Sequence, residues 1–324
     1  MKKRLTALLC VVLCLAAIFS LTGCKYKTER SNLWKYKYED TDAPDLKDAG
    51  VGRENANEDG WYITMDENFD GNELPDNWKT SMNINRNREM YWCRNMAKVE
   101  DGYLKLGAET AEQHNKTCPN VARHGKLDKP ATTLVGTAFY KGGTGYDYYF
   151  TQAFGYYEIK CKLPESDGMW MSFWLQNPHE GRTGDKGKDG SEIDIFESAF
   201  FNDKTKTASC IHYDGYGDST HLLEGIHDVG VNTYDGFHTY ALKWTPTEYV
   251  FYYDGEPIWA TDGDGGVCQT PCYLNISGHI AENRKAAYKQ MMGELTGGEL
   301  LVDYVKVYQN KNYEEHIKQW SDFD

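Results

Sequence analysis

The six residues Glu192-Ile193-Asp194-Ile195-Phe196-Glu197 place three carboxylates inside an apolar stretch that is typical of a buried β-strand. Burying an ionised carboxylate costs several kcal/mol unless the group is paired or its pKa shifts. Folding alone requires none of these acids. Their convergence therefore indicates acid–base or nucleophilic chemistry.

Strand geometry decides which way each acid points. Side chains alternate along a strand, so Glu192 and Asp194 share one face while Ile193 and Ile195 point into the core. Strict alternation would then send Glu197 into the core. One extra residue, a β-bulge at Ile195-Phe196, returns Glu197 to the face of the other two acids, and we predict this bulge.

Three neighbouring acids cannot all ionise without a large cost in electrostatic repulsion, so their protonation is coupled. We expect Glu192 to stay charged as a nucleophile and Glu197 to hold a proton for a leaving oxygen. Asp194 would share a hydrogen bond with Glu192 and adjust both. Glycoside hydrolysis uses two carboxylates in this way, about 5–5.5 Å apart in a retaining enzyme. The alternatives are a satisfied carboxylate cluster and a calcium loop, although calcium loops favour glycine and asparagine.

The chain from Trp61 to about Gln309 reads as all-β. Short segments rich in Val, Tyr, Phe, Thr and Ile alternate with Gly, Asp and Asn turns, and Asp254-Gly255 marks a hairpin. About 250 residues of this kind predict one sandwich of two antiparallel sheets, with a concave sheet as a groove for an extended polymer. Short helices are expected over 281–295 and 311–320. The 24 Tyr and 9 Trp suit sugar stacking in that groove, although tyrosine also favours strands.

The N-terminus is typical of an exported protein. Met1-Lys2-Lys3-Arg4 precedes an apolar run that ends in Leu21-Thr22-Gly23-Cys24. That tetrapeptide resembles the lipobox of bacterial lipoproteins, which implies cleavage before Cys24 and a lipid on its sulfur; an ordinary secretory signal is the alternative. The expected divisions are a signal peptide (1–23), a polar tether (24–58), a catalytic domain (59–310) and a C-terminal tail (311–324). The lipid would hold the domain at the outer face of a bacterial membrane or cell surface.

The formal charge of the chain is −14, and loss of Lys2, Lys3 and Arg4 with the signal would bring it near −17 (−14 − 3). Such a surface repels nucleic acid and anionic lipid, whereas a neutral polymer is indifferent to it. We therefore expect a polysaccharide partner, no nucleic-acid partner and a monomer.

The cysteines leave their redox state open. Six remain besides the signal-peptide cysteines and Cys24, namely Cys93, Cys118, Cys161, Cys210, Cys268 and Cys272. An even number in an exported chain allows three disulfides in fifteen pairings, and free buried thiols are the alternative. Because the spacings match no zinc cluster, we expect no metal on cysteine.

The segment Glu192–Glu197 matches the signature of glycoside hydrolase family 16 in its bulged E-x-D-x-x-E form. The resemblance covers about residues 60–309 and implies a concanavalin-like β-jelly-roll fold, with Glu192 as nucleophile, Asp194 as its assistant, Glu197 as general acid/base and no required cofactor. Other segments that carry it are Asp66–Asp70, Asp101–Leu104, Gly155–Pro164, Met169–Leu175, Ile211–Tyr213, Phe237–Trp244, Tyr253–Gly255 and Val302–Tyr308.

The resemblance also suggests binding residues. It places Trp170 and Trp174 in the cleft as sugar platforms and His212 beside Glu197 or a sugar hydroxyl, although one tryptophan could belong to the core and the histidine could be satisfied by backbone. Weaker candidates for sugar contacts are Arg88, Tyr91 and Trp92. Some members of the family bind a structural calcium ion, and the matching positions are Glu67, Gly102 and Asp303.

One departure from the family leaves the substrate open. Many glucan-cleaving members carry a Gly-Gly-x-Trp segment where this chain reads Ser277-Gly-His-Ile-Ala-Glu-Asn-Arg284, and Met171-Ser-Phe-Trp174 is closer to galactan-cleaving members. A β-1,3- or β-1,3-1,4-glucan is the first expectation, and a β-galactan such as agar, porphyran or a mucin-type chain is the second. A non-catalytic glycan-binding lipoprotein is the rival from another class, and a transglycosylase would use the same acids.

Overall fold

The computed structural model describes residues 38, 40–80, 85–86, 90–119, 122, 125–141, 145–165, 168–180, 184–198, 200, 202–215, 221–280 and 295–323. The chain divides into two units, Met1–Asp40 and Thr41–Asp324. The expected signal peptide, Cys24, Arg88 and all but the last residue of the helix expected at 281–295 lie outside the described residues. None of the helices in the described ranges has the length and apolarity needed to cross a membrane.

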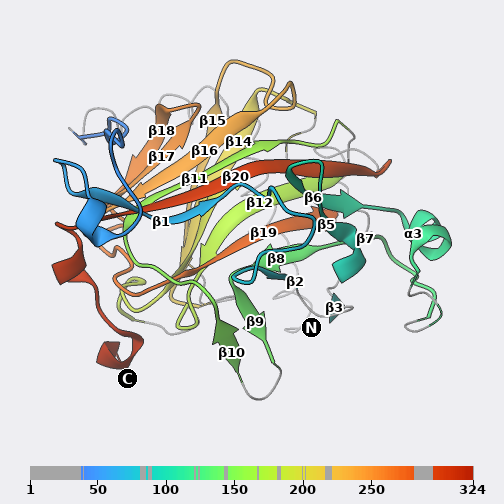
Figure 1. The fold of residues 1–324 in the computed structure, drawn as a ribbon, viewed down its shortest axis with the longest axis horizontal. Helices are drawn as coiled ribbons and strands as arrows, with labels where there is room; N and C mark the ends of the chain where they lie inside the picture. Colours follow the sequence, from blue (N-terminus) through green and yellow to red (C-terminus); the bar gives the residue numbers. More distant parts are fainter. Residues whose placement is uncertain are drawn as a thin grey trace, which may run out of the picture. The chain divides into compact units, whose positions relative to one another are not determined.

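The second unit is built on two stacked antiparallel sheets (Figure 1). Within the described residues the first sheet has the order β18-β17-β16-β11-β20-β6-β5. Strand β1 also pairs with β20, along the edge opposite β11 that β6 shares. Its strands are β1 (Trp61–Glu67), β5 (Ala97–Glu100), β6 (Tyr103–Ala108), β11 (Gly155–Lys162), β16 (His238–Trp244), β17 (Tyr249–Tyr253), β18 (Glu256–Thr261) and β20 (Gly298–Asn310).

The second sheet has the order β15-β14-β13-β12-β19-β8-β2. Its strands are β2 (Lys79–Thr80), β8 (Leu134–Gly136), β12 (Met169–Gln176), β13 (Ser191–Glu197), β14 (Lys206–Tyr213), β15 (His221–Asp228) and β19 (Tyr273–Ile280). Two small sheets accompany it, one of β9 (Ala138–Tyr140) and β10 (Tyr146–Tyr148), the other of β3 (Asn85–Arg86), β4 (Tyr91–Trp92) and β7 (Ala131–Thr132).

The core lies between the two sheets because each strand sends alternate side chains inward. Phe173 and Leu175 of β12 and Ile193 and Ile195 of β13 are at most 2% exposed. Across the interface Phe196 stacks on Tyr240 of β16, with ring centroids 4.1 Å apart. This burial fixes the register of β13 and leaves its other face for the acids.

The predicted hairpin at Asp254-Gly255 is confirmed as the connection of β17 and β18, and φ values of 47° and 80° suit an Asp-Gly turn. A helix that the sequence reading did not predict, α3 (Ala111–Thr117), begins with a capping box between Thr110 and Gln113. The tail forms the 3₁₀ turns η6 (Glu314–His316) and η7 (Trp320–Phe323) instead of the helix expected at 311–320.

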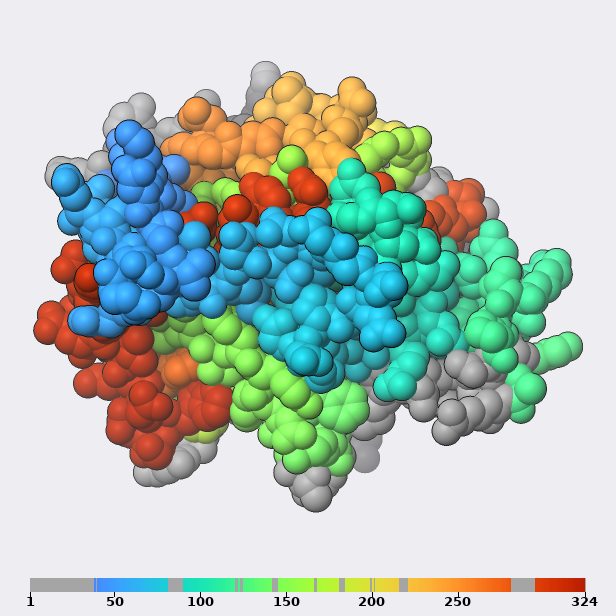
Figure 2. Space-filling view, in the orientation of Figure 1, coloured from blue at the N-terminus to red at the C-terminus, as the bar shows by residue number. Residues whose placement is uncertain are grey.

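Part of the expected tether packs on the sandwich. The carbonyl of Asp42 accepts a hydrogen bond from Lys243 Nζ at 2.9 Å, and Arg53 Nε pairs with Glu314 at 2.8 Å. Figure 2 shows this N-terminal part of the unit (blue) lying against the C-terminal segment (red). The packed unit therefore begins at Thr41, earlier than the boundary at residue 59 that the sequence suggested.

Candidate active site

The predicted bulge is present in β13. On one side Asp194 pairs with Trp174 and Glu197 with Ser172, and the register shifts between the two pairs. On the other side Asp194 pairs with Cys210 and Glu197 with Ala208, so that Ile195 and Phe196 together occupy the place of one residue. The inserted residue puts Glu192, Asp194 and Glu197 on the face of the sheet opposite the core.

Directly paired residues of neighbouring strands share a face, so the strand register defines three rows of side chains on that surface. Each row contains one of the acids and crosses from β19 through β12 and β13 to β14. The rows are Tyr273–Gln176–Glu192–His212, Asn275–Trp174–Asp194–Cys210 and Ser277–Ser172–Glu197–Ala208.

Glu197 is held by two donors from the neighbouring strands. Trp170 Nε1 donates to Glu197 Oε1 at 2.9 Å, and Cys210 Sγ donates to Oε2 at 3.5 Å. Burial raises the pKa of Glu197 to about 7, the Cys210 and Trp170 hydrogen bonds oppose the rise, and the charge of Glu192 adds to it. The carboxyl group can therefore hold a proton near neutral pH and release it within the site.

Asp194 is 5% exposed and lies between the two glutamates. Burial raises its pKa well above the usual range, and the charges of Glu197 and Glu192 raise it further. Its Oδ2 lies 3.5 Å from His212 Nε2, which is 3.9 Å from Glu192 Oε1. Because burial lowers the pKa of His212, its imidazole is neutral at neutral pH and adds no positive charge to the row.

Glu192 is oriented by an amide that the sequence reading did not single out. Gln176 Nε2 donates to Glu192 Oε2 at 3.3 Å, while Gln176 Oε1 accepts a hydrogen bond from Tyr273 OH at 2.8 Å. The tyrosine thus fixes which end of the amide faces the carboxylate. These two hydrogen bonds fix the direction of the Glu192 carboxyl group, as a nucleophile requires.

The two predicted tryptophan platforms lie on strand positions of the acid face. Trp174 Nε1 donates to Ser277 Oγ at 3.0 Å, and Trp170 binds Glu197 as described. The ring of Trp170 lies 6.2 Å from that of His279, which in turn lies 5.8 Å from the ring of Trp92. An aromatic series therefore leads away from Glu197 along this end of β12 and β19.

Tyr91 is the predicted binding residue that the structure places elsewhere. It is 7% exposed in a small apolar cluster with Cys93, Leu127 and Ala131, and its hydroxyl donates to Asp128. The reason is that side chains alternate along β4, so that Trp92 and Tyr91 point in opposite directions. Trp92 points towards β19, where its Nε1 donates to the Gly278 carbonyl at 3.1 Å.

The carboxylates proposed for calcium already have protein partners. Glu67 Oε1 accepts the Phe69 N–H at 2.8 Å, and Asp303 pairs with Lys160 at 2.8 Å. Gly102 occupies the β5–β6 turn with a φ of 78°. The calcium site stays a prediction from the sequence.

Two groups of described residues bring three metal-ligating atoms within 4.8 Å of one another. One, Asp194 with Cys210 and His212, is part of the acid rows. The other lies in a separate part of the fold and consists of Cys93, His114 and Cys118.

Several residues of this surface were not predicted from the sequence, among them Gln176, Cys210 and His279. Period-two alternation from Trp174 and His212 marks the first two as facing the acids. The third becomes visible only through the pairing of β12 with β19.

The family model described as "Glycosyl hydrolases family 16" matches residues 85–297. An endo-1,3-1,4-beta-glycanase, ExsH, of Rhizobium meliloti is 30% identical over 176 residues, which cover 51% of this chain and 34% of the relative. This chain thus spans about a third of that relative's length. A beta-glucanase of Rhodothermus marinus is 24% identical over 264 residues, covering 76% of this chain and 85% of the relative.

Solved structures share the fold. A structure reported under "Prominent members of the human gut microbiota express endo-acting O-glycanases to initiate mucin breakdown" has a TM-score of 0.59, with 22% identity over 79% of this chain and 94% of that one. The catalytic domain of an endo-1,3-beta-glucanase (laminarinase) from Thermotoga petrophila has a TM-score of 0.58, with 22% identity over 78% and 99% of the two chains.

Proposed function

The chain belongs to family 16 of the glycosyl hydrolases, and on this premise we propose that it is a retaining endo-glycosidase that cleaves a β-linked polysaccharide. The observation that supports this most is the bulged strand β13, which presents Glu192 and Glu197 to one face, with the pKa of Glu197 raised by burial to about 7. One group can thus attack while the other donates a proton.

In the first step Glu197 gives its proton to the glycosidic oxygen while a carboxylate oxygen of Glu192 attacks the anomeric carbon. The bond to the leaving sugar breaks, and a covalent glycosyl–Glu192 ester forms with inverted configuration. Asp194 stabilises the arrangement because its raised pKa lets it carry a proton beside Glu192 without adding a second charge.

In the second step the ionised Glu197 takes a proton from water, whose oxygen attacks the same anomeric carbon. The ester bond breaks, Glu192 returns as a carboxylate, and the second inversion restores the original configuration. Nucleophile and proton both come from the chain, so the chemistry needs no cofactor.

For the substrate we propose a β-1,3- or β-1,3-1,4-glucan. The names of the relatives support this class, since the two relatives described above are called endo-1,3-1,4-beta-glycanase and beta-glucanase. Mixed-linkage glucan, laminarin, agarose, porphyran and mucin form the test panel. Release of oligosaccharides from the glucans, with the β-anomer appearing first by NMR, is expected; cleavage of the galactans alone would move the substrate to the second class.

Binding without cleavage of any glycan on the panel, seen as retardation in affinity electrophoresis, would favour the glycan-binding lipoprotein instead. Products longer than the substrate would identify a transglycosylase.

We further propose that the mature protein is a monomer anchored by a lipid on Cys24 at the outer face of a bacterial membrane or cell surface. The charged start, apolar run and Leu21-Thr22-Gly23-Cys24 support this. Mass spectrometry of the mature N-terminus should find a diacylglycerol on Cys24, and Cys24→Ala should release the protein from the membrane fraction. An unmodified N-terminus at another residue would contradict the anchor.

A further inference from the structure

Three potential metal ligands from separate segments meet beside the small sheet of β3, β4 and β7. Cys93 follows β4 directly, His114 lies within α3, and Cys118 caps the C-terminal end of α3 with its N–H donating to the His114 carbonyl at 2.9 Å. One donor atom of each lies within 4.8 Å of the others. His114 and Cys118 are four residues apart, which places both on one face of the helix.

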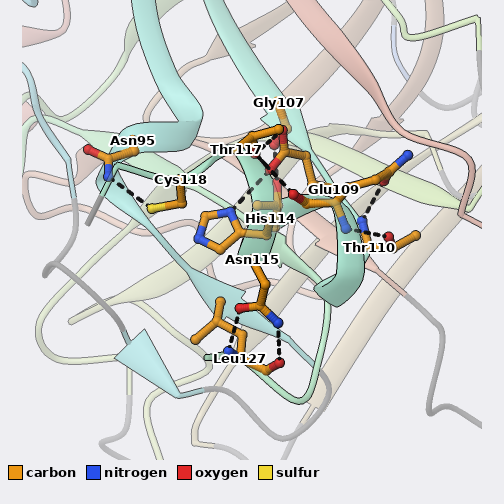
Figure 3. Close-up of polar contacts among 11 residues, drawn as sticks. Asn95, Gly107, Glu109, Thr110, His114, Asn115, Thr117, Cys118 and Leu127 are labelled. Atoms are coloured by element: carbon orange, nitrogen blue, oxygen red, sulfur yellow. Dashed lines mark hydrogen bonds and ion pairs between the residues drawn. The ribbon is translucent and has the colours of Figure 1, made fainter. Parts of the chain in front are cut away.

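The imidazole of His114 is held in its orientation by the carboxylate of Glu109. Its Nδ1 lies 3.2 Å from Glu109 Oε2, and Glu109 itself accepts hydrogen bonds from Thr117 Oγ1 at 2.9 and 3.1 Å. Figure 3 shows one ring nitrogen of His114 directed at Glu109 and the other on the side of Cys118. A carboxylate on the far nitrogen of a histidine is the usual outer partner of a metal-bound imidazole, because it sets the tautomer and the ring orientation.

The two cysteine sulfur atoms also accept hydrogen bonds. Asn95 Nδ2 donates to Cys118 Sγ at 3.3 Å, and the Asn95 backbone N–H donates to the Cys93 thiol. N–H donors suit thiolates, whose charge they stabilise. The surroundings are apolar, since Cys93 and Cys118 pack with Leu127 and Ala131, which limits access of water to the group.

The scaffold around these residues is held by its own hydrogen bonds. Asn115 on α3 donates to the Leu127 carbonyl at 2.8 Å and accepts the Leu127 N–H at 2.7 Å, while the capping box fixes the start of the helix (Figure 3). His114 is 0% exposed. The ligand positions are therefore set by the fold before any ion arrives, which favours binding.

From this geometry we propose that Cys93, His114 and Cys118 bind one Zn²⁺ ion, with Glu109 as the outer partner of the histidine. Two thiolates and one imidazole are the ligand types that select zinc, and three protein ligands leave a fourth tetrahedral position for solvent. Ligands at zinc distances lie roughly 3.5–3.8 Å apart, so the ligand atoms need to approach one another by at most about 1.3 Å from the 4.8 Å limit.

The sequence spacing predicted no metal on cysteine, because Cys93 stands apart from the His114–Cys118 pair along the chain and the fold alone brings the three together. The proposal is independent of the glycosidase proposal. Its consequence for the cleft is local: Cys93 adjoins Trp92, whose ring contacts His279 on the acid face. A zinc ion would anchor this wall of the cleft to α3.

The test is metal retention by the folded, reduced chain. The full-length protein is equilibrated with Zn²⁺ under a non-chelating phosphine reductant, desalted and analysed by elemental mass spectrometry. We expect about one zinc per chain in the wild type and in Cys268→Ser, the matched control that removes a buried cysteine elsewhere in the core. Cys118→Ser and His114→Ala should lose the ion.

Glu109→Gln provides a variant that keeps all three ligands. It should fold and bind zinc about 10–100-fold more weakly in competition with a chromophoric chelator. Cobalt substitution should give the intense visible bands of tetrahedral thiolate coordination in the wild type and in Cys268→Ser, and should not give them in Cys118→Ser or His114→Ala.

A folded wild type without retained zinc, or equal retention by Cys118→Ser, would overturn the proposal. So would a native Cys93–Cys118 disulfide, mapped by mass spectrometry, in protein that binds no zinc after reduction.

Discussion

At the scale of single residues, Glu197 owes its behaviour to opposing influences on its pKa. Burial and the charge of Glu192 raise that pKa, while hydrogen bonds from Cys210 and Trp170 lower it, with about 7 as the result. The proton donor is thus adjusted by two side chains on neighbouring strands, one of which is a cysteine that takes no other part in the proposed reaction.

The pH dependence of the activity should follow the pKa of Glu197. In the wild type kcat/KM should fall as the pH rises through about 7, because Glu197 then loses the proton it must donate. Cys210→Ala removes a hydrogen bond to the ionised form and should move this alkaline limb to higher pH. Cys210→Ser, which keeps a donor, should move it less, and identical limbs in all three proteins would show that Cys210 does not act on Glu197.

Stability should depend on the same proton. The pKa of Glu197 is near its usual 4.5 in the unfolded chain and about 7 in the folded one, so the folded state binds more protons between these values. The contribution of Glu197 to stability is therefore fully present below about pH 4.5 and is lost as the pH rises through about 7.

Glu197→Gln should flatten this dependence. One pKa unit corresponds to about 1.4 kcal/mol, so the variant should gain up to about 3 kcal/mol over the wild type at pH 8, measured by urea unfolding. Part of the slope should persist, because the raised pKa of Asp194 acts in the same direction. A larger slope in the variant than in the wild type would contradict the assignment.

At the scale of elements, strand β13 depends on one hydroxyl opposite its bulge. Ser209 of β14 is fully buried, and its Oγ donates to the Ile195 carbonyl at 3.0 Å. The bulge leaves this carbonyl outside the regular ladder, so that the serine replaces a backbone partner.

Ser209→Ala should therefore lower stability by about 1–3 kcal/mol and reduce kcat, because Glu197 follows two residues after Ile195. Thr233→Val is the matched control: it removes a buried hydroxyl that donates to the Lys204 carbonyl at 3.1 Å, away from the bulge. It should cost less stability, because the Thr233 N–H still donates to that carbonyl at 2.8 Å, and it should leave kcat unchanged. Ser209→Ala with full kcat would show that the hydroxyl does not hold the acid in place.

An element could be predicted from the sequence where residues close to it in the chain determine its structure. The bulge followed from the sequence because a carboxylate at position 197 pointing into the core is costly. Helix α3 had a local signal as well, the capping pair Thr110 and Gln113, which the strand-rich surroundings obscured. Predicting the burial of Tyr91 would have required knowledge of which face of β4 meets β19.

At the scale of the whole molecule, contacts distant in sequence complete the unit. The segment from Thr41 onwards contributes the Asp42 carbonyl, which accepts hydrogen bonds from Lys243 and from Tyr252 OH at 3.1 Å. Gly50 accepts the Ile63 N–H at 2.8 Å. The sequence assigned this segment to a tether because it is polar and without periodicity, and because two of its partners, Lys243 and Tyr252, lie about two hundred residues away.

Two truncations test the boundary. A chain that begins at Thr41 should keep all of these contacts, whereas one that begins at Asp59 loses them and leaves Lys243, which is 3% exposed, without its carbonyl partner. We expect the shorter chain to melt several degrees lower, since 1 kcal/mol corresponds to about 2–4 °C at this size. Equal melting temperatures in calorimetry would show that residues 41–58 contribute nothing to stability.

The overall account rests on Glu192 and Glu197 acting on one glycosidic bond from a single bulged strand. The most direct test is covalent trapping with a 2-deoxy-2-fluoro glycoside built on the sugar of the polysaccharide that the protein cleaves, followed by peptide mapping. The account predicts one label per chain, attached to Glu192, and none in Glu192→Ala. A label on any other residue, or cleavage of the polysaccharide with inversion and no trapped ester, would contradict it.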